Sequence, residues 1–251
     1  MSIKISIITA VYNRVDTIGR SINSVQTQDC VDYEHVIVDG QSDDGTLRKI
    51  NEKLDSRTVL SSEPDEGIYD ALNKGLARST GDVIGFMHSD DLYHDDTILK
   101  RVSDIFSGGD VDIVYGDAVF FQKDQPDKIV RIYKSGEYSV KRLAWGWMPS
   151  HPSMFIHKSI YEKYGYFKTD YKIAADYEFL CRIMTGGRLN VSYLPEVFVR
   201  MQVGGASTGG FRNTLQLNKE VLRACRENRI YSNMLMILSK YPVKMLQFLL
   251  K

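Results

Sequence analysis

The chain has 251 residues, which suggests one large domain or two small ones around a sizeable hydrophobic core. Its composition, 43% hydrophobic and 25% charged, is that of a globular protein and excludes disorder and fibrous repeats. Lys and Arg number 32, as do Asp and Glu, and this neutrality argues against a dedicated nucleic-acid binder, which carries a strong basic excess.

Predicted strands and helices alternate over the first part of the chain. The strands are expected at 3–11, 34–38, 58–61, 82–87 and 111–115, and the helices at 15–28, 44–54, 67–79 and 97–106. In the first helix the apolar residues recur at spacings of 3, 4 and 3, which places them on one face. This order predicts an α/β fold with a mostly parallel sheet flanked by helices, in which ligands bind beyond the carboxyl ends of the strands.

The pattern changes in the second part of the chain. A hairpin is expected from two strands at 119–122 and 129–133, followed by an aromatic loop that contains Trp147 and His151. The remaining elements are a strand, two helices, a long extended segment and a helical end, at 154–156, 158–164, 174–184, 189–202 and 211–251. The glycine-rich stretch 204–210 is expected to be mobile.

The sequence HSDD at 88–91 directly follows a predicted buried strand. Two adjacent carboxylates repel each other, and a hard divalent cation that also carries substrate phosphates is a natural partner for them. The alternative is a solvated turn in which the two aspartates cap the next helix. The spacing alone leaves both interpretations open.

Two further polar clusters also follow predicted strands. In DGQSDDGT, at 39–46, Asp39 would accept a hydrogen bond from a base N–H or a ribose hydroxyl, and the alternative is a helix-entry turn. In EPDEGIYDALNKG, at 63–75, Gly67 permits close backbone approach and Lys74 would reach a phosphate. The alternative there is a capped surface helix with a solvated lysine.

The sequence AADYEF at 174–179 places two acids at the start of a helix. Asp176 and Glu178 are two residues apart and therefore do not share a helical face, so that one can point inward. An inward-facing Asp176 beneath a pocket is a candidate general base, whereas acids at helix starts also serve as caps.

These motifs occur in an order that resembles a known family. From residue 3 to about 207, the elements DGQSDDGT, SEPDEGIYDALNKG, HSDD, HPSMF and ADYEF are similar to those of family 2 glycosyltransferases of the GT-A fold. The nearest resemblance is to the bacterial surface-polysaccharide branch, which includes colanic acid and O-antigen (lipopolysaccharide) enzymes. It implies a Rossmann-like GT-A domain at 1–210, with a nucleotide-binding half at 1–115 and an acceptor-side half at 116–210.

The resemblance also implies roles for individual residues. Asp39 and Asp65 would contact the base, usually uracil, within the nucleotide-sugar-binding set Thr9, Ala10, Val11, Asn13, Asp39, Asp65, Gly67, Asp70, Asn73, Lys74, Ser89 and Asp90. His88 stands where the family's Asp-x-Asp element begins, which leaves Asp90 and Asp91 to hold ribose and a Mn²⁺ or Mg²⁺ ion.

The same resemblance also assigns a catalytic base and residues on the acceptor side of the site. Asp176 matches the catalytic base, and His151 and Trp147 are placed on the acceptor side, although a packed loop histidine is the alternative for His151. The implied enzyme is an inverting, metal-dependent hexosyltransferase with a nucleotide-diphosphate sugar, most often UDP-linked, as donor. Its acceptor would be a saccharide, in this branch often linked to polyprenyl diphosphate. The alternative is a non-catalytic nucleotide-sugar or saccharide-binding module of the same fold.

Splitting the charge along the chain separates a basic tail from an acidic body. Residues 212–251 carry a net +6 and the remaining 211 residues a net −6. A basic amphipathic helical tail at 211–251 would lie on an anionic membrane surface, or pack on the domain or on a second subunit of a homodimer. Three cysteines without a CxxC pair favour a reducing compartment, so a cytoplasmic protein is expected. The lipid-linked acceptors that the resemblance implies favour the membrane alternative for the tail, at the inner face of the bacterial cytoplasmic membrane.

Overall fold

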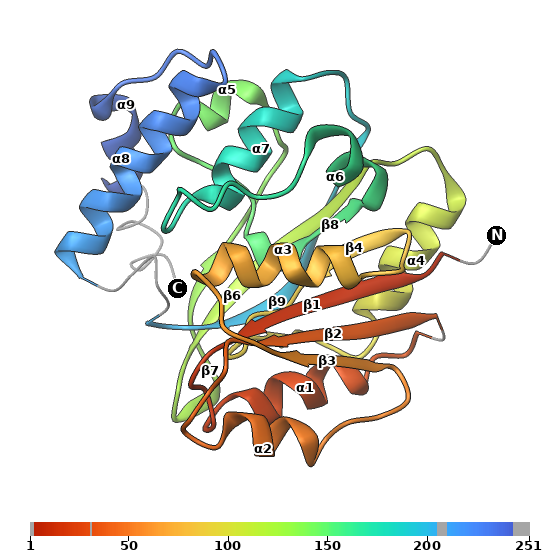
Figure 1. Cartoon of the computed structure of the whole chain (residues 1–251). Coiled ribbons are helices and arrows are strands. Elements are labelled where there is room, and N and C mark those ends of the chain that lie inside the picture. The colour runs from red at the N-terminus through yellow and green to blue at the C-terminus, as the bar shows by residue number, and fades with distance from the viewer. Residues whose placement is uncertain (1–2, 31, 205–209, 243–251) are drawn as a thin grey trace.

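A computed structural model describes residues 3–30, 32–204 and 210–242 of the chain. In this part the chain forms one nine-stranded sheet in the order β3-β2-β1-β4-β8-β6-β9-β5, with β7 paired to β6 (Figure 1). The strands are β1 (Ile5–Val11), β2 (Tyr33–Asp39), β3 (Thr58–Ser62), β4 (Val83–Phe86), β5 (Leu92–Tyr93), β6 (Ile113–Gln122), β7 (Gln125–Tyr133), β8 (Met154–His157) and β9 (Val191–Gln202).

Most strands of this sheet point in the same direction. β1 pairs in parallel with β2 and β4, and β2 pairs in parallel with β3. β8 runs antiparallel between β4 and β6, so that β6 has the direction of the first four strands, and β9 is parallel to β6. The carboxyl ends of these six strands therefore meet at one edge, which confirms the expected mixed α/β class.

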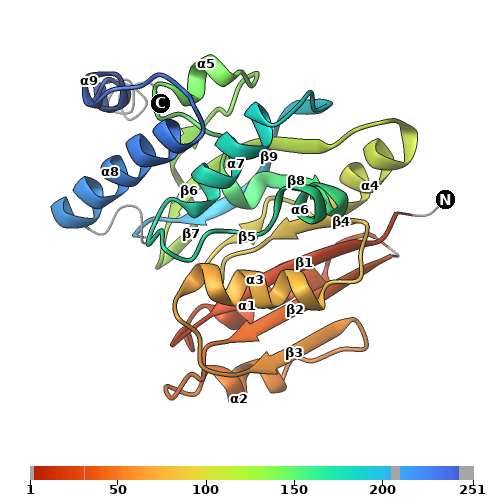
Figure 2. The ribbon, with the colours of Figure 1, turned by 45° about the horizontal axis from the view of Figure 1, so that its top comes forward.

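The helices cover both faces of the sheet (Figures 1 and 2). They are α1 (Ile18–Gln26), α2 (Thr46–Asn51), α3 (Ile68–Arg78), α4 (Ile98–Gly108), α5 (Val140–Leu143), α6 (Lys158–Tyr164), α7 (Ala175–Thr185), α8 (Phe211–Glu227) and α9 (Met234–Leu238), with a 3-10 turn at His151–Ser153.

Side-chain alternation along the strands explains these layers. Ile8 belongs to the core cluster that contains residues of α3, α6 and α7, whereas Ile7 belongs to the cluster on the opposite face with residues of α1 and α4. β1 is buried on both faces because helices cover both, which is why its sequence is almost continuously apolar. α3 approaches β1 closely at Gly75, where a Cβ atom would lie 2.4 Å from Cγ2 of Ile8.

The structure shifts several predicted boundaries. The hairpin is tighter than expected, because β6 continues to Gln122 and β7 already starts at Gln125. The sequence reading missed β5 and α5, which are only two and four residues long. The glycine-rich stretch expected to be mobile falls largely on 205–209, and the end of the tail on 243–251; both segments lie outside the described residues.

The described part of the tail is helical and packs on the domain. α8 buries Val221, Ala224 and Cys225 in the same core cluster as α7. Within the parts of the chain that the structure describes, no helix combines the length and the apolar character that crossing a membrane requires.

Candidate active site

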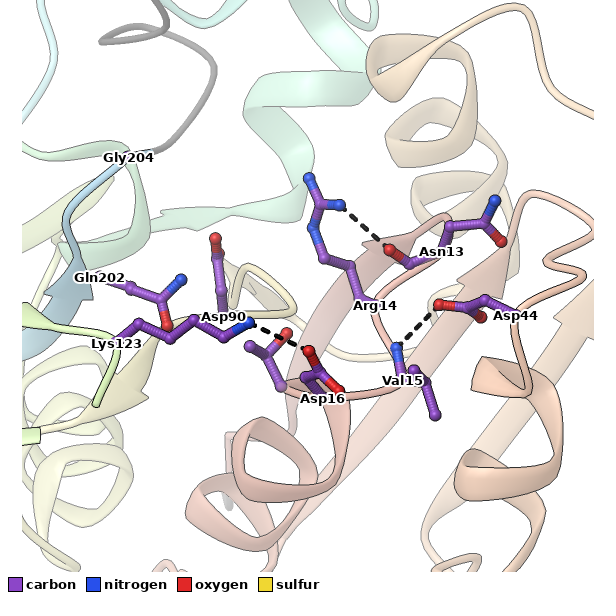
Figure 3. Close-up of a pocket in the computed structure, with 10 residues that line it drawn as sticks. Asn13, Arg14, Val15, Asp16, Asp44, Asp90, Lys123, Gln202 and Gly204 are labelled. Atoms are coloured by element: carbon purple, nitrogen blue, oxygen red, sulfur yellow. Dashed lines mark hydrogen bonds and ion pairs between the residues drawn. The ribbon is translucent and has the colours of Figure 1, made fainter. Parts of the chain in front are cut away.

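A pocket of about 230 Å³ opens at the edge where the carboxyl ends of the strands meet (Figure 3). Its walls come from the segments that follow β1, β2, β4 and β6 and from the end of β9. The lining residues are Asn13, Arg14, Val15, Asp16, Thr17, Asp44, Asp90, Lys123, Gln202 and Gly204. The position is the one expected for a ligand site in an open α/β sheet.

Residues at the end of β1 hold neighbouring strands together, and the segment that follows lines the pocket. The buried Thr9 hydroxyl donates to the Met87 carbonyl at 2.8 Å and therefore accepts from Nε2 of His35 at 2.9 Å, which ties β1 to its two neighbours. The Val11 side chain is also buried, and Ala10 is half-buried. Of the predicted residues on this strand end, Asn13 is the one that lines the pocket.

Asn13 reaches the pocket through an unusual backbone conformation. Its φ of 52° lies in the left-handed region, which Asn tolerates better than most residues. Its Oδ1 accepts from the Asp43 N–H at 3.1 Å, and its own N–H donates to the Ser42 hydroxyl at 2.9 Å. These bonds lock the segment after β1 against the segment after β2.

One carboxylate oxygen of Asp39 has no hydrogen-bond partner in the described part of the chain. The side chain is fully buried, and Oδ2 accepts from the Ser42 N–H at 3.1 Å and from the Ser62 hydroxyl at 2.7 Å. Oδ1 is also buried, and no hydrogen bond to it exists among the described residues. An unsatisfied buried acceptor costs free energy, so a ligand N–H or O–H that reached Oδ1 would be favoured.

Asp65 packs directly beside the end of β2. A Cβ atom on Gly40 would lie 2.3 Å from Oδ2 of Asp65, so a larger residue there would displace this carboxylate. Oδ1 of Asp65 accepts from the Gly67 N–H at 2.8 Å, and Gly67 has a φ of 123° that favours glycine. The structure thus brings together Asp39 and Asp65, which sequence resemblance assigned to the base.

The other predicted residues of α3 are engaged within the chain. The Asn73 amide exchanges two hydrogen bonds with the Phe167 backbone, at 2.8 and 3.0 Å. Lys74 pairs with Asp70 at 2.9 Å and donates to the Pro64 carbonyl at 2.7 Å. None of Asp70, Asn73 and Lys74 lines the pocket, and their assignment to the nucleotide sugar stays a prediction.

The two adjacent aspartates after β4 have different surroundings. Asp90 lines the pocket, whereas Asp91 is buried and its Oδ1 accepts from the Gln202 N–H at 2.9 Å. Ser89, the residue before Asp90, is also buried. Burial, followed by the charge of Asp90, raises the pKa of Asp91 well above its usual value.

This acidic pair fits a divalent cation that is shared with a substrate. The described residues contain no group of three His, Cys, Asp or Glu side chains that would hold a metal alone. Mg²⁺ and its relatives, however, commonly bind through one or two carboxylates together with substrate phosphates. Asp90 supplies a carboxylate at the pocket, and a cation there would offset its repulsion with Asp91.

Asp176 lies at the start of α7, against α3. Its Oδ1 accepts from the Tyr177 N–H at 2.8 Å and lies 3.2 Å from the Tyr69 hydroxyl. Burial raises the pKa of Asp176 to about 6, although these two hydrogen bonds oppose the shift. Asp176 is half-buried as a residue, and its role as the catalytic base stays a prediction.

A buried glutamate from α8 holds the segment that leads into α7. Glu220 accepts three backbone hydrogen bonds of 2.9 Å each, from Lys172, Ile173 and Ala174. Burial would raise the pKa of Glu220, but the Gln216 side chain and these three N–H groups outweigh it and lower the pKa. Sequence reasoning missed this residue, which fixes the backbone next to Asp176.

His151 connects the loop that precedes β8 with the end of β4. Its ring stacks on Phe86 at 4.7 Å between centroids and lies 5.9 Å from the ring of His88. Burial and the charge of His88 lower the pKa of His151 to about 3, so its imidazole is neutral at physiological pH. Trp147 is half-buried under the guanidinium of Arg142, at 3.6 Å from the ring centroid.

Two cations of the pocket were not anticipated from the sequence. Arg14 follows β1, and Lys123 follows β6, where its Nζ pairs with Asp16 at 3.0 Å across the pocket wall (Figure 3). Arg20 of α1 also donates to Lys123 and Gln202, which joins α1 to the ends of β6 and β9. The rule that strand ends carry the ligand groups would have found Lys123, had the strand at 119–122 been recognised as the end of a sheet strand that starts at Ile113.

The fold and this site define a class of protein, the transferases of the GT-A type, and comparison with known proteins identifies the family. The model of glycosyl transferase family 2 matches residues 6–166. Because the match covers more than half of the chain, the protein belongs to this family and is a glycosyltransferase.

Curated relatives carry the same description. A PGL/p-HBAD biosynthesis glycosyltransferase of Mycobacterium tuberculosis is 28% identical over 222 residues, which cover 87% of this chain and 82% of that protein. An uncharacterized glycosyltransferase of the same species is 31% identical over 181 residues, which cover 71% of this chain and 68% of the relative.

Solved structures of low sequence identity confirm the GT-A fold. Staphylococcus aureus TarS 1–349 in complex with UDP-GlcNAc has a TM-score of 0.70 at 18% identity, over 88% of this chain and 66% of that one. The mannosyltransferase PcManGT from Pyrobaculum calidifontis, in complex with GDP-Man and Mn²⁺, has a TM-score of 0.67 at 19% identity. The match covers 89% of this chain and 65% of that one. The chain thus spans just under two thirds of these structures, and 39% of a longer TarS structure.

Proposed function

We propose that the protein is an inverting glycosyltransferase that moves a sugar from a UDP-linked donor to a hydroxyl of an acceptor saccharide in cell-surface polysaccharide biosynthesis. The observation that carries this proposal is the buried Asp39 at the carboxyl edge of the sheet, whose Oδ1 accepts no hydrogen bond from any described residue. The imino N–H of uracil would satisfy this oxygen, with Asp65 and Gly40 beside it. The nucleotide-sugar complexes of TarS and PcManGT support a donor of this kind.

The donor diphosphate would lie over the pocket that Asp90 lines. Arg14 and Lys123 offer positive charge to phosphate oxygens from two sides of this pocket. Asp90 and Asp91 would hold a Mn²⁺ or Mg²⁺ ion, which when bound stabilises the negative charge of the departing nucleoside diphosphate. The Mn²⁺ bound in PcManGT supports this assignment.

Asp176 would accept the proton of the attacking hydroxyl. Tyr69 and Tyr177 hold its Oδ1, and its pKa of about 6 leaves the carboxylate ionised in most molecules at neutral pH. Attack from the side opposite the leaving diphosphate inverts the anomeric centre. His151, which is neutral, and Trp147 would border the acceptor, for which a polyprenyl-diphosphate-linked saccharide on the cytoplasmic side of the membrane is the proposed form.

The test uses a panel of nucleotide sugars with Mn²⁺, and measures donor affinity by calorimetry and nucleoside diphosphate release by a coupled assay. We expect one UDP-sugar to bind and to be turned over slowly by water and faster with the acceptor. Binding of a donor without turnover in any combination would instead identify a non-catalytic nucleotide-sugar-binding module. Failure of every donor to bind would refute the role given to Asp39.

A further inference from the structure

α8 carries a row of cations on its outward side. Arg212, Lys219 and Arg226 are exposed and follow one another at intervals of seven residues, or about two helical turns. They therefore lie on one face, which we call the α8 basic face, over about 21 Å of helix. Within the described residues, none of the three forms an ion pair.

The acidic residues of α8 do not reach this face. Glu220 is buried against the segment that precedes α7. Glu227 pairs with Lys168 at 2.9 Å and with Arg223 at 2.7 Å, so its charge is already matched. The α8 basic face thus presents an uncompensated positive charge to whatever lies against it.

Two exposed apolar side chains follow the end of α8 in the chain. Tyr231 is 81% exposed and Leu235, on α9, is 82% exposed. A hydrogen bond of 2.6 Å from Ser232 to the Ala144 carbonyl fixes this connection against α5. In both views α8 lies at the outer boundary of the molecule, with α7 on its inner side (Figures 1 and 2).

We propose that the α8 basic face docks on a membrane surface of anionic lipids, with Tyr231 and Leu235 entering the headgroup layer. Charge complementarity argues for this occupant, because each Lys or Arg close to an anionic leaflet is attracted to it. The exposed aromatic and aliphatic side chains that follow α8 in the chain also suit such an interface. The same helix anchors Ala174 through Glu220, so docking holds Asp176 beside the membrane that carries a lipid-linked acceptor.

The experiment measures sedimentation of the full chain with phosphatidylcholine vesicles that contain or lack phosphatidylglycerol, without any nucleotide sugar. The test variant removes the α8 basic face and combines Arg212→Gln, Lys219→Gln and Arg226→Gln. The control variant loses the same number of positive charges elsewhere on the surface, on α2, α4 and β7. It combines Arg48→Gln, Lys100→Gln and Lys128→Gln. All six side chains are at the surface, so both variants should fold, which circular dichroism verifies.

We expect binding to vesicles with phosphatidylglycerol only, with loss of binding at about 1 M salt, where charges are screened beyond about 3 Å. The test variant should bind about a hundredfold more weakly, and the control should bind like the unmodified protein. Leu235→Ser should weaken binding by about tenfold.

Three results would overturn the proposal. They are unchanged binding of the test variant, an equal loss in the control, and retention by a soluble acidic polysaccharide without any binding to vesicles. The last would identify an anionic glycan as the occupant. The vesicle experiment contains no nucleotide sugar, so membrane docking can be refuted while the proposed transferase function stands.

Discussion

The proposed donor side and the proposed acceptor side of the site are positioned in different ways. On the donor side, Asn13, Asp39 and Asp90 follow strand ends, and bonds between neighbouring loops such as Asn13 to Asp43 hold them. On the acceptor side, Asp176 depends on Tyr69 of α3 and on Glu220 of α8, which are far away in the sequence. A change on the acceptor side should therefore alter turnover and leave donor binding unchanged, and a change on the donor side should do the reverse.

The largest effect is expected from Asp176→Asn. The amide cannot accept the hydroxyl proton, so transfer should fall by about a thousandfold or more. Donor affinity measured by calorimetry should stay within about twofold, because the donor side has its own supports. Near-normal turnover would contradict the base assignment, and a parallel loss of donor binding would contradict the separation of the two sides.

A large loss of donor affinity is expected from Asp39→Ala. The variant removes the acceptor proposed for uracil and should weaken donor binding by about ten- to a hundredfold. Asp43→Ala is the matched control, because Asp43 is exposed and only its backbone N–H is used. If both variants bound the donor equally well, Asp39 would have no part in base recognition.

A smaller effect, confined to turnover, is expected from Glu220→Gln. One amide group cannot accept all three N–H bonds, so the backbone before Asp176 should shift and kcat should fall by about tenfold with unchanged donor affinity. The negative charge of Glu220 also helps to raise the pKa of Asp176, so the midpoint of the kcat–pH profile should move down. A loss of stability without this shift would reduce Glu220 to a structural role.

The pH dependence of kcat tests the same base without mutation. Asp176 acts deprotonated, and burial raises its pKa to about 6, so kcat should be constant at higher pH and fall as pH decreases through about 6. At pH 5 it should be about a tenth of its plateau. A profile that is flat down to pH 4.5 would exclude a carboxyl group with this raised pKa as the base.

The smallest effect is expected from Lys123→Met. Its ion pair with Asp16 is exposed, so its removal should change the free energy of unfolding by less than about 1 kcal/mol. Donor affinity should fall by about threefold if Lys123 also faces the diphosphate. Lys128→Met, which removes an exposed cation of the same hairpin outside the pocket, is the control.

The sequence allowed much of the donor side to be anticipated. Strand periodicity located the ends of β1, β2 and β4, and polar residues at those ends indicated Asn13 and Asp90. Lys123 was missed because the strands predicted at 111–115 and 119–122 are one sheet strand, β6, whose carboxyl end lies beside the pocket. The hydrogen bonds of Asn73 to the Phe167 backbone could not be anticipated, and its assignment to the nucleotide sugar stays a prediction.

The acceptor side depended on contacts that no local pattern reveals. The sequence indicated that Asp176 begins a helix, and family resemblance made it the candidate base. The carboxylate of Glu220, however, reaches backbone groups more than forty positions earlier in the chain. The stacking of His151 on Phe86 likewise depends on how β4 and the 3-10 turn pack together.

The insertion of β8 between β4 and β6 has a consequence for biosynthesis of the protein. Ile84 pairs with Ile156, so the first four strands keep an open edge on β4 until the ribosome has made the residues of β8. Exposed edges of this kind invite pairing with other chains. A nascent chain that stalls before residue 154 should therefore be prone to aggregate, and productive folding should begin only when the second half emerges.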